Sequence, residues 1–504
     1  MGSKVQKFKS SKVQKFESSY LRYAPNDRQS RAKVLISATL RTIGKPCKGS
    51  YLRYAPNDRQ SSAKVLISAT LRTIGKPCKR LYFMIETIVL DMGGVLMNHD
   101  IPACVKKYQE LLGANFPQLG LCSDGEPAPN IKSILYDYEI GGASSEDFVN
   151  ALLPLCKEGT SAREILDAWN LMLAGIPAHR LEKVLELRKR YPMFLLSNNN
   201  EEHWRYIVEQ YFTPETAPNS SPETAPNSSP ETGHESPVDF YGCGSMRGLP
   251  EVRRSGLPVA AYFDETFLSH LMRIGKPDIR IYEEADKVIA ERWKTLPTAA
   301  NHPYDKSTTI FVDDLPANRE SAMQYGWQTC ASLEELNVLL FLQEHHIPFT
   351  WYNHPEGKTI EEAKRWWHDD GSVHCKNLFF RNHKGNVHYL VCFDCDHDLA
   401  IHDLEHRLKA SLVAAGKPAP GKLSFASPER MMRYLGLQPG SVSPFGLIND
   451  KEHEVILFLD KNLLDAPSLS FHPNDCRGTV VISRDAFQDY LRSVGNTVEY
   501  LELY

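Results

Sequence analysis

The sequence predicts an α/β domain built on a parallel sheet, followed by an α+β domain, and three observations support this division. Three short, continuously apolar runs, "TIVLD", "MFLLSN" and "TIFVDD", lie far apart in the first two thirds of the chain and are separated by helical patterns. Such runs are typical of parallel strands that are covered on both faces. In the last third, strand patterns follow one another closely and alternate with helices, which is typical of α+β domains. At 504 residues the chain is also too long for one ordinary core.

The first 83 residues differ from the rest of the chain. "SKVQKFKS" is followed by "SKVQKFES", and the segment 20–48 recurs almost unchanged at 51–79. Residues 1–83 contain 11 Lys and 8 Arg against 2 Asp and 1 Glu, a net charge of +16. We expect this basic, duplicated, low-complexity tail to be disordered, and three interpretations are open: a nucleic-acid arm, a targeting segment, or translated upstream sequence without function. The position of Met84, just before the first strand, favours the last interpretation.

Residues 84–331 form the first predicted domain, which contains the three apolar strands. Residues 101–185, between the first and second strands, have the pattern of amphipathic helices. A segment of about 213–258 begins with "PETAPNSSPETAPNSSPETG". Its density of Pro, Ser and Asn predicts a disordered surface insertion.

Each of the three strands ends in polar side chains. In a parallel sheet ligands bind beyond the carboxyl ends of the strands, so these side chains are expected to share one crevice. A carboxylate can accept a phosphoryl group as a nucleophile, carboxylate oxygens suit Mg²⁺, and a lysine such as that in "IGKPDIRIY" can neutralise the transferred group. The chemistry that this set supports is phosphoryl transfer. The candidate residues are Asp91, Ser197, Asn198, Lys276, Asp313 and Asp314.

The segments "VLDMGGVL", "FLLSNNN", "GKPDIRIY" and "FVDDLPANRESAMQYG" resemble the four motifs of the haloacid dehalogenase (HAD) superfamily, over about residues 84–331. The resemblance implies a Rossmann-like parallel sheet with a helical cap, formed by residues 101–185, that encloses a small phosphorylated metabolite. It implies Asp91 as the nucleophile, Ser197 and Lys276 as phosphate-binding residues, and Mg²⁺ as the cofactor. The implied metal ligands are Asp91, the carbonyl of Gly93, Asp313 and Asp314.

Gly93 is a departure from the superfamily pattern. Most phosphatases that the chain resembles carry Asp at this position, as the acid that protonates the leaving group. General-acid help contributes about 10²–10⁴-fold to a rate, so its loss slows turnover without abolishing it. We therefore expect an active Mg²⁺-dependent phosphatase with an aspartyl-phosphate intermediate. The alternative is a catalytically quiet scaffold.

Residues 332–504 form the second predicted domain and contain 12 of the 18 histidines. Strand patterns at "KNLFFRN", "VHYLVCF", "GLINDKEHEVILFLD" and "TVVISRD" are mixed with helical patterns, which indicates an α+β domain. Three local features are candidates for a site: Lys376 at the start of a strand, the small-residue loop "GSVSP", and His472 before a proline. The loop contributes the candidates Gly440, Ser441 and Pro444.

The segments "HCKNLFFRNHKGNVHYLV", "LSFASPERMMRYLGLQPGSVSPFGLIND" and "SFHPNDCRGTVVIS" closely resemble the YbaK/ProX family. This family consists of aminoacyl-tRNA editing domains related to the insertion domain of bacterial prolyl-tRNA synthetase, and it hydrolyses the ester between a wrong amino acid, such as alanine, and the tRNA 3′ end. The resemblance implies that Lys376 contacts the terminal phosphate or the substrate, that the loop from Gly440 to Pro444 holds the aminoacyl group, and that His472 shapes the pocket. The implied partner is the acceptor end of mischarged tRNA(Pro), with no cofactor.

The charge of the second domain is an objection to tight tRNA binding. Residues 332–504 hold 17 Lys and Arg against 24 Asp and Glu, a net charge of −7. A tRNA-binding protein usually presents a basic face. Either only the acceptor end is gripped, or the basic tail contributes. A module that binds tRNA or a synthetase without hydrolysing anything is the alternative.

The eleven cysteines follow no regular framework, which suits a reducing compartment, and we expect a cytoplasmic protein. For Cys392 and Cys395 in "CFDC", thiols on a buried strand are favoured over a zinc site, since no second Cys pair follows. The longest apolar runs, such as "NVLLFL", are too short to span a membrane, so no membrane partner is expected.

Overall fold

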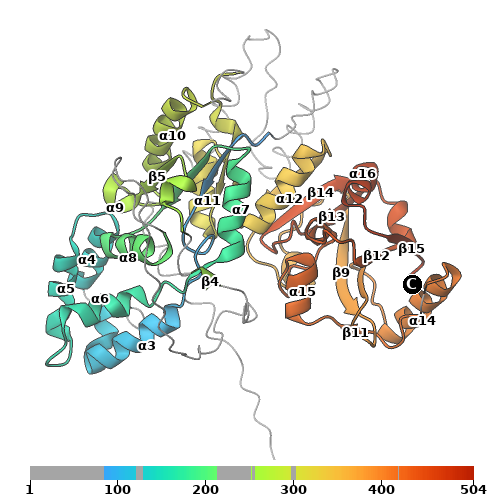
Figure 1. Ribbon diagram of the computed structural model, residues 1–504, viewed down its shortest axis with the longest axis horizontal. Coiled ribbons are helices and arrows are strands. Elements are labelled where there is room, and N and C mark those ends of the chain that lie inside the picture. The colour runs from blue at the N-terminus through green and yellow to red at the C-terminus, as the bar shows by residue number, and fades with distance from the viewer. Residues whose placement is uncertain (1–83, 121–128, 213–250, 253–255, 297–301, 418) are drawn as a thin grey trace, which may run out of the picture. The chain divides into compact units, whose positions relative to one another are not determined.

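The computed structural model describes residues 84–120, 129–212, 251–252, 256–296, 302–417 and 419–504 (Figure 1). The tail predicted for residues 1–83 and most of the insertion predicted for about 213–258 lie outside these described residues. The boundaries predicted for the domains stay predictions.

The first sheet contains five strands in the order β5-β3-β1-β6-β7, and every neighbouring pair is parallel. Val89 lies opposite Phe194 on one side and opposite Phe311 on the other. The strands are β1 (Thr87–Leu90), β3 (Met193–Ser197), β5 (Glu265–Leu268), β6 (Thr309–Val312) and β7 (Gln328–Cys330). The parallel sheet predicted from the three apolar runs is confirmed.

The strands of this sheet are buried on both faces because alternate residues enter two apolar cores. Ile88 and Leu90 pack in the core that includes α7, whereas Val89 packs with Phe311 and with α10 on the other face. This explains why the runs are continuously apolar rather than alternating. The covering helices are α7 (Ala178–Arg188), α8 (Glu201–Tyr211), α9 (Ser269–Met272), α10 (Ile279–Trp293) and α11 (Pro316–Tyr325).

A group of helices is inserted between β1 and β3, as the cap prediction requires (Figure 1). The chain enters and leaves this group through two paired segments, in which the Asn98 amide donates to the carbonyl of Gly175 and the Ala174 amide to that of Asn98, both at 2.9 Å. The predicted cap range 101–185 also includes the start of α7, which packs on the sheet. The cap helices are α3 (Ile101–Leu112), η2 (Gly113–Leu119), α4 (Pro129–Glu139), α5 (Ser145–Leu152) and α6 (Ala162–Asn170).

The second sheet is mixed, with the strand order β15-β12-β10-β9-β13-β14-β8, and β11 pairs with β9. The pairs β10–β12, β12–β15 and β9–β13 are parallel and the others are antiparallel. This confirms the α+β prediction. The strands are β8 (Phe349–Asn353), β9 (Val373–Arg381), β10 (His388–Asp394), β11 (Ser424–Phe425), β12 (Val455–Asp460), β13 (Ser468–Phe471), β14 (Gly478–Ser483) and β15 (Val498–Leu501).

One strand prediction is wrong in its first half. The run "GLINDKEHEVILFLD" begins in the 3₁₀ helix η7 (Pro444–Asn449), and β12 starts only at Val455. The reason is a turn closed by Asp450, whose carboxylate accepts hydrogen bonds from the amides of Glu454 at 3.1 Å and Val455 at 2.8 Å. The helices of this part are α13 (Ile360–Ala363), α14 (Ile401–Ala414), α15 (Pro428–Leu435), η8 (Lys461–Leu464) and α16 (Arg484–Val494).

Helix α12 (Leu333–Glu344) is apolar around most of its circumference, which is typical of a helix buried on all sides. Its Gln343 side chain bonds the backbone of Ile85, next to β1, and its Phe341 ring packs on Tyr490 of α16, with the ring centroids 5.8 Å apart. Helix α12 therefore contacts the segment before β1 and helix α16. Experiments on either site are best made with the full chain.

Candidate active sites

Three neighbouring strands of the first sheet bring the predicted phosphoryl-transfer residues together. Asp91 follows β1, Ser197 ends β3, and Asp313 and Asp314 follow β6, and β1 lies between the other two strands. Carboxylate oxygens of Asp91, Asp313 and Asp314 all lie within 4.8 Å of one another. The carboxyl ends of adjacent parallel strands therefore form one acidic pocket, as expected for this architecture.

Lys276 is the buried cation of this pocket. Its Nζ lies 2.9 Å from Oδ2 of Asp91 and 2.7 Å from Oδ2 of Asp313, and it also donates to the carbonyl of Leu196 at 3.1 Å. Burial by itself lowers the pKa of Lys276, but Asp313 and Asp91 raise it above its ordinary value. The ammonium is thus fixed in its charged form beside the predicted nucleophile.

Asn198 fixes the backbone of Lys276. Its Oδ1 accepts from the Lys276 amide at 2.7 Å, and its Nδ2 donates to the Lys276 carbonyl at 2.9 Å. The neighbouring Ser197 is buried, and its hydroxyl donates a long bond of 3.4 Å to the carbonyl of Asn198. Asn198 therefore positions the lysine, in addition to the substrate-binding role predicted for it.

The three carboxylates carry more negative charge than Lys276 can balance. Burial raises the pKa of Asp91 to about 8, with Lys276 opposing the shift and Asp313 and Asp314 adding to it. Burial and Asp313 likewise raise the pKa of Asp314. A divalent cation among these oxygens would relieve the repulsion and restore the Asp91 anion. Hard oxygen donors in this number fit Mg²⁺.

The loop after β1 approaches Asp314 closely because it contains glycine. Gly94 has φ +70°, and a Cβ at this residue would lie 2.4 Å from Oδ2 of Asp314. Gly93, whose carbonyl is a predicted metal ligand, forms a bridge with Met97. Only a glycine at residue 94 allows both the backbone conformation and the approach.

Several residues around this pocket were not found by sequence reasoning. From the cap, Glu139 accepts a 2.5 Å bond from Asn198 Nδ2, and burial raises its pKa against the opposing effects of Asn198 and Lys276. Behind the pocket, Asn318 Nδ2 donates to both oxygens of Asp313, and Arg319 donates to its carbonyl at 2.7 Å. Asn318 and Arg319 lie in the first helical turn after Pro316. A proline shortly after the Asp pair, as in "DDLPANRES", indicates that a helix begins there, so the sequence contained a signal for these two residues. Glu139 carried no comparable signal.

In the second sheet, the loop of residues 440–444 meets the turn of residues 472–478. The Ser441 hydroxyl hydrogen-bonds the Cys476 thiol, and Asn474 Nδ2 donates to the carbonyl of Phe445 at 3.3 Å. The Gly440 backbone has φ +93°, and its missing side chain faces Lys358. Pro444 starts η7 and is held by a 2.8 Å bond from the Tyr490 hydroxyl to its carbonyl. The predicted loop and the turn after His472 therefore share one region.

His472 and Lys376 are related through the pairing of β13 with β9. Ser470 lies opposite His374 in this parallel pair, and His472 and Lys376 each lie two residues further along their own segment. His472 is held by a 3.4 Å contact of Nδ1 with the carbonyl of Gly478, and burial lowers its pKa. Lys376 is partly exposed, with Nζ 3.8 Å from Asp398 and 5.9 Å from the centre of the Phe393 ring.

Residues of β9 that the sequence did not single out also belong to this region. The His374 imidazole stacks on the Trp367 ring with 3.8 Å between ring centroids. Burial, with a smaller contribution from His472, lowers the pKa of His374 to about 4 against the opposing effect of Asp370. Of the predicted CxxC pair, Cys392 is buried on β10 and burial raises the pKa of Cys395 to about 11. All seven cysteines in the described residues are free.

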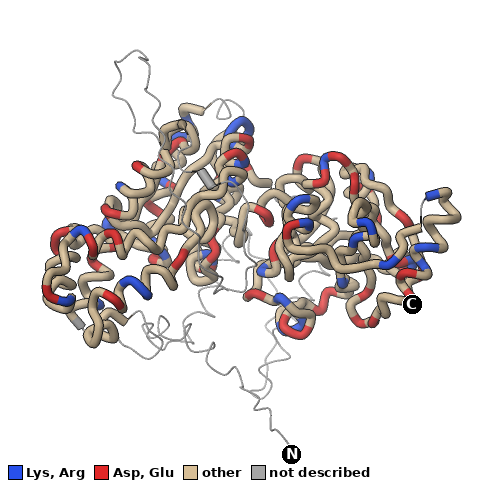
Figure 2. Tube along the Cα trace, turned by 60° about the horizontal axis from the view of Figure 1, so that its bottom comes forward, with Lys and Arg blue, Asp and Glu red and all other residues tan. Residues whose placement is uncertain are grey.

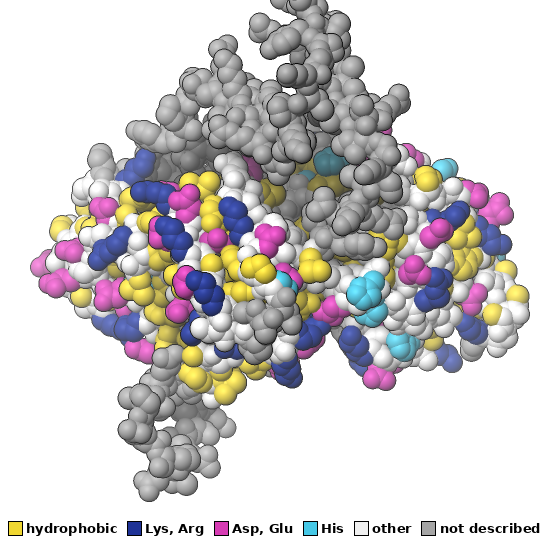
Figure 3. All heavy atoms as spheres, turned by 90° about the horizontal axis from the view of Figure 1, so that it is seen from above, with side chains coloured by type: hydrophobic (Ala, Val, Ile, Leu, Met, Phe, Trp, Pro, Cys, Tyr) yellow, Lys and Arg dark blue, Asp and Glu magenta, His cyan; other side chains and the backbone are white. Residues whose placement is uncertain are grey.

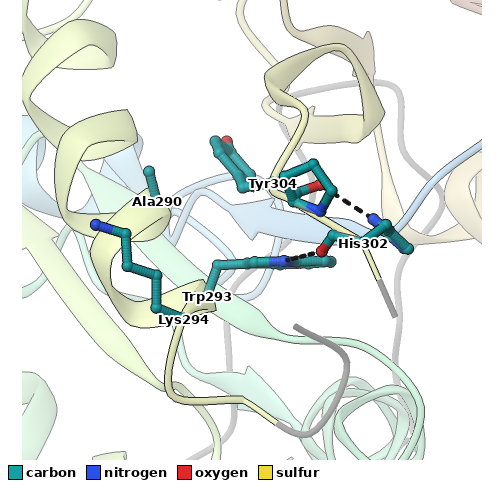
Figure 4. Close-up of a pocket in the computed structure, with 6 residues that line it drawn as sticks. Ala290, Trp293, Lys294, His302 and Tyr304 are labelled. Carbon is teal, nitrogen blue, oxygen red and sulfur yellow. Dashed lines mark hydrogen bonds between the residues drawn. The ribbon is translucent and has the colours of Figure 1, made fainter. Parts of the chain in front are cut away.

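A separate hollow of about 430 Å³ lies at the end of α10 (Figure 4). Trp293 Nε1 donates to the carbonyl of His302 at 3.2 Å across it. Residues 297–301, which join the two sides of this hollow, lie outside the described part of the chain, and we assign it no function. Its lining residues are Ala290, Trp293, Lys294, His302, Pro303 and Tyr304.

Comparison with known proteins gives matches for both parts of the chain. The family model named "Aminoacyl-tRNA editing domain" matches residues 354–490. The prolyl-tRNA editing protein ProX of Acetoanaerobium sticklandii is 37% identical over 166 residues, which cover 33% of this chain and 95% of that protein. D-ribitol-5-phosphate phosphatase of Bacteroides thetaiotaomicron is 28% identical over 157 residues, or 31% of this chain and 72% of that protein. A solved HAD-family enzyme of the same organism, in complex with magnesium and inorganic phosphate, aligns with a TM-score of 0.34 at 23% identity, covering 49% of this chain and 93% of that one.

The fold, the two sites and these relatives together define a two-domain hydrolase. Its N-terminal part is homologous to HAD-family phosphatases, with the acidic pocket at the carboxyl end of the parallel sheet. Through its C-terminal third, the chain belongs to the ProX family of prolyl-tRNA editing proteins. No helix among the described residues is long and apolar enough to cross a membrane.

Proposed function

We propose that the chain is a bifunctional hydrolase, with a trans-editing aminoacyl-tRNA deacylase in its C-terminal third and a Mg²⁺-dependent phosphatase in its N-terminal part. The editing proposal is supported by the ProX relationship together with the meeting of the 440–444 loop and the 472–478 turn. The proposed substrate is mischarged Ala-tRNA(Pro), bound through its acceptor end in the cytoplasm.

In the proposed editing reaction, water attacks the ester carbonyl that joins alanine to the terminal ribose, and the ribose hydroxyl leaves. The 440–444 loop would hold the aminoacyl group with its backbone amides, while His472 shapes the pocket and Lys376 contacts the terminal phosphate. An aminoacyl ester is already activated, so positioning of water and substrate is the main contribution required of the protein. The proposal requires no cofactor.

The first test is deacylation of Ala-tRNA(Pro) and of Pro-tRNA(Pro) by the full chain. Selective release of alanine supports editing. Equal release of both amino acids would contradict the proposed specificity, and release of neither would favour a module that binds tRNA or a synthetase without hydrolysis.

Charge restricts how the tRNA can be bound. On the face shown in Figure 3, basic side chains are intermingled with acidic ones, and residues 332–504 carry a net charge of −7. Binding of the whole tRNA would need a broad basic surface. We therefore propose that this part of the protein grips only the acceptor end, and that its affinity depends on the pocket more than on phosphate contacts.

The proposed phosphatase reaction uses Asp91 as the nucleophile. One Asp91 oxygen attacks the phosphorus of a small phosphomonoester, and the bond to the bridging oxygen breaks, so that the alkoxide leaves and takes a proton from solvent. Water then hydrolyses the aspartyl-phosphate to the Asp91 carboxylate and inorganic phosphate. Lys276 neutralises the transferred group and Ser197 bonds one of its oxygens. Asp91, the Gly93 carbonyl, Asp313 and Asp314 would hold Mg²⁺, which supplies further neutralisation of the phosphoryl oxygens. The observation that carries this proposal is the Lys276 bridge between Asp91 and Asp313.

The phosphatase is tested by phosphate release from ribitol 5-phosphate and other polyol phosphates, with and without Mg²⁺. Release that stops on chelation and returns with Mg²⁺ supports the proposal. Gly93 favours the alternative of a quiet scaffold, which would show no phosphate release from any phosphomonoester at saturating Mg²⁺.

A further inference from the structure

The space next to Gly93 is filled by the side chain of His99. A Cβ at Gly93 would lie 2.6 Å from Cε1 and 2.7 Å from Nε2 of the His99 ring. These distances are well inside van der Waals contact. The Nε2–Cε1 edge of the imidazole therefore occupies the place where a side chain at residue 93 would begin, two residues beyond the nucleophile.

The backbone around His99 is fixed at the junction between the sheet and the cap. His99 forms an antiparallel bridge with Leu173, and on either side Asn98 and Asp100 are paired with the returning segment. The Asp100 side chain also caps α3 by accepting from the amide of Ala103 at 2.9 Å. His99 thus has little freedom to leave the position beside Gly93.

The His99 ring keeps access to solvent, although protein atoms crowd one side of it. His203 of α8 lies near His99; its ring stacks on Trp169 with 5.3 Å between centroids, and its Nε2 contacts the carbonyl of Trp169 at 3.1 Å. His203 is held by these contacts and is buried. Of this histidine pair, His99 is the one that a substrate can reach.

We propose that His99 donates a hydrogen bond from Nε2 to the leaving-group oxygen of the phosphate ester, in place of the carboxylic acid that related phosphatases carry at residue 93. This inference rests on the proposed phosphatase function. It makes His99 a catalytic residue, since the imidazole touches the bond that breaks between phosphorus and the bridging oxygen.

The test compares two substrates with the full chain in Mg²⁺. Ribitol 5-phosphate has an alkoxide leaving group that needs a hydrogen-bond donor, whereas p-nitrophenolate leaves p-nitrophenyl phosphate as a stable anion. His99→Ala is expected to lower kcat/KM for ribitol 5-phosphate by about 10²-fold. For p-nitrophenyl phosphate, the fold-loss in kcat/KM is expected to be at least ten times smaller. His99→Gln keeps a donor and is expected to retain more activity on ribitol 5-phosphate than His99→Ala. The control is His179→Ala, an exposed histidine at the start of α7.

A second variant tests the exchange of positions. Gly93→Asp alone places a side chain against the His99 ring and is expected to lose activity on both substrates. Gly93→Asp combined with His99→Ala returns an acid to the space that the His99 ring has left. This double variant is expected to recover activity on ribitol 5-phosphate. Equal losses on both substrates for His99→Ala, or no loss, would overturn the inference while leaving the phosphatase intact. Hydrolysis of neither substrate by the unsubstituted chain would overturn the proposed phosphatase and this inference with it.

Discussion

Lys276 is held between two buried carboxylates, and its replacement would affect both stability and turnover. Lys276→Met leaves Asp91 and Asp313 without their common cation, and breaking a buried ion pair in this way costs about 3–5 kcal/mol. Loss of charge stabilisation should also lower kcat for phosphate release by about 10²–10³-fold. Chemical denaturation and phosphate release measure the two effects.

The control for this substitution is Lys294→Met. Lys294 is also in an ion pair, with Glu291 at 2.6 Å, but both side chains are exposed, and such pairs contribute only about 0–1 kcal/mol. If the two lysine variants lost similar stability, the claim that Lys276 balances the acidic pocket would be wrong.

Glu335 in α12 gives a prediction about pH. Its side chain is fully buried; burial and then Asp475 raise its pKa from 4.5 to about 7, while the amide of Ala331 opposes the shift by donating to the carboxylate. At pH values between 4.5 and about 7, Glu335 is protonated in the folded chain but ionised in the unfolded chain. The stability that Glu335 contributes is therefore fully present below pH 4.5 and is lost as pH rises through about 7.

Glu335→Gln should remove this dependence. The free energy of unfolding of Glu335→Gln relative to the unsubstituted chain is expected to rise by about 3 kcal/mol from pH 4 to pH 8. Denaturant unfolding at a series of pH values measures it, and Glu334→Gln, the same change one residue earlier in α12, is the control. A relative stability that does not vary with pH would contradict the prediction.

At the scale of elements, the loop after β1 is the segment on which the first site depends. Gly94→Ala introduces a Cβ 2.4 Å from the Asp314 carboxylate at φ +70°, so both the loop and the carboxylate must move. We expect a higher Mg²⁺ concentration for half-maximal phosphate release, because Asp314 is a proposed ligand, and a stability loss beyond about 1 kcal/mol. Gly159→Ala is matched in backbone strain, with φ +86°, but meets no atom within 4 Å. Equal Mg²⁺ requirements in the two variants would show that the close approach is unimportant.

The secondary-structure elements also show which features could be predicted from the sequence and why other features could not. The parallel strands were predictable because burial on both faces leaves unbroken apolar runs, and their polar ends pointed to Asp91, Ser197 and the Asp313–Asp314 pair. The start of β12 was not predictable, because the turn before it is closed by hydrogen bonds from the amides of residues 454 and 455 to the Asp450 carboxylate. Such bonds produce no periodic pattern in the sequence. His99 escaped for a different reason. Its closeness to Gly93 comes from the pairing of residues 98–100 with 172–175, a contact between segments distant in the sequence.

At the scale of the whole molecule, the charge distribution distinguishes between binding of the tRNA acceptor end alone and binding of the tRNA with help from the basic tail. Figure 2 shows basic and acidic residues interspersed along the described chain, and the sequence after residue 83 carries a net charge of −20 against +16 for the tail. A protein that contacts many phosphates loses affinity steeply as salt rises. If the protein grips the acceptor end alone, the affinity for tRNA is expected to fall only slightly as salt rises. A steep fall in affinity would instead indicate that the tail acts as a nucleic-acid arm.

For the whole molecule, we expect that single substitutions can remove the two activities separately. Asp91→Asn deletes the nucleophile and should abolish phosphate release while leaving Ala-tRNA(Pro) deacylation unchanged. Its stability should be preserved, since the burial that raises the pKa of Asp91 to about 8 favours an uncharged side chain. Lys376→Ala should abolish most deacylation and leave phosphate release unchanged. The ion pair that it removes, between Lys376 and the exposed Asp398 at 3.8 Å, contributes little to stability.

Each of these variants is the control for the other, because both are assayed in the full chain with both substrates. Loss of deacylation in Asp91→Asn would mean that the acidic pocket serves the editing site, and the two reactions could no longer be regarded as independent. Phosphate release that survives Asp91→Asn would remove Asp91 as the nucleophile. If Lys376→Ala lowered only the affinity for tRNA while the hydrolytic rate at saturation stayed the same, Lys376 would be a binding residue, and the positioning of water would have to come from the 440–444 loop and His472.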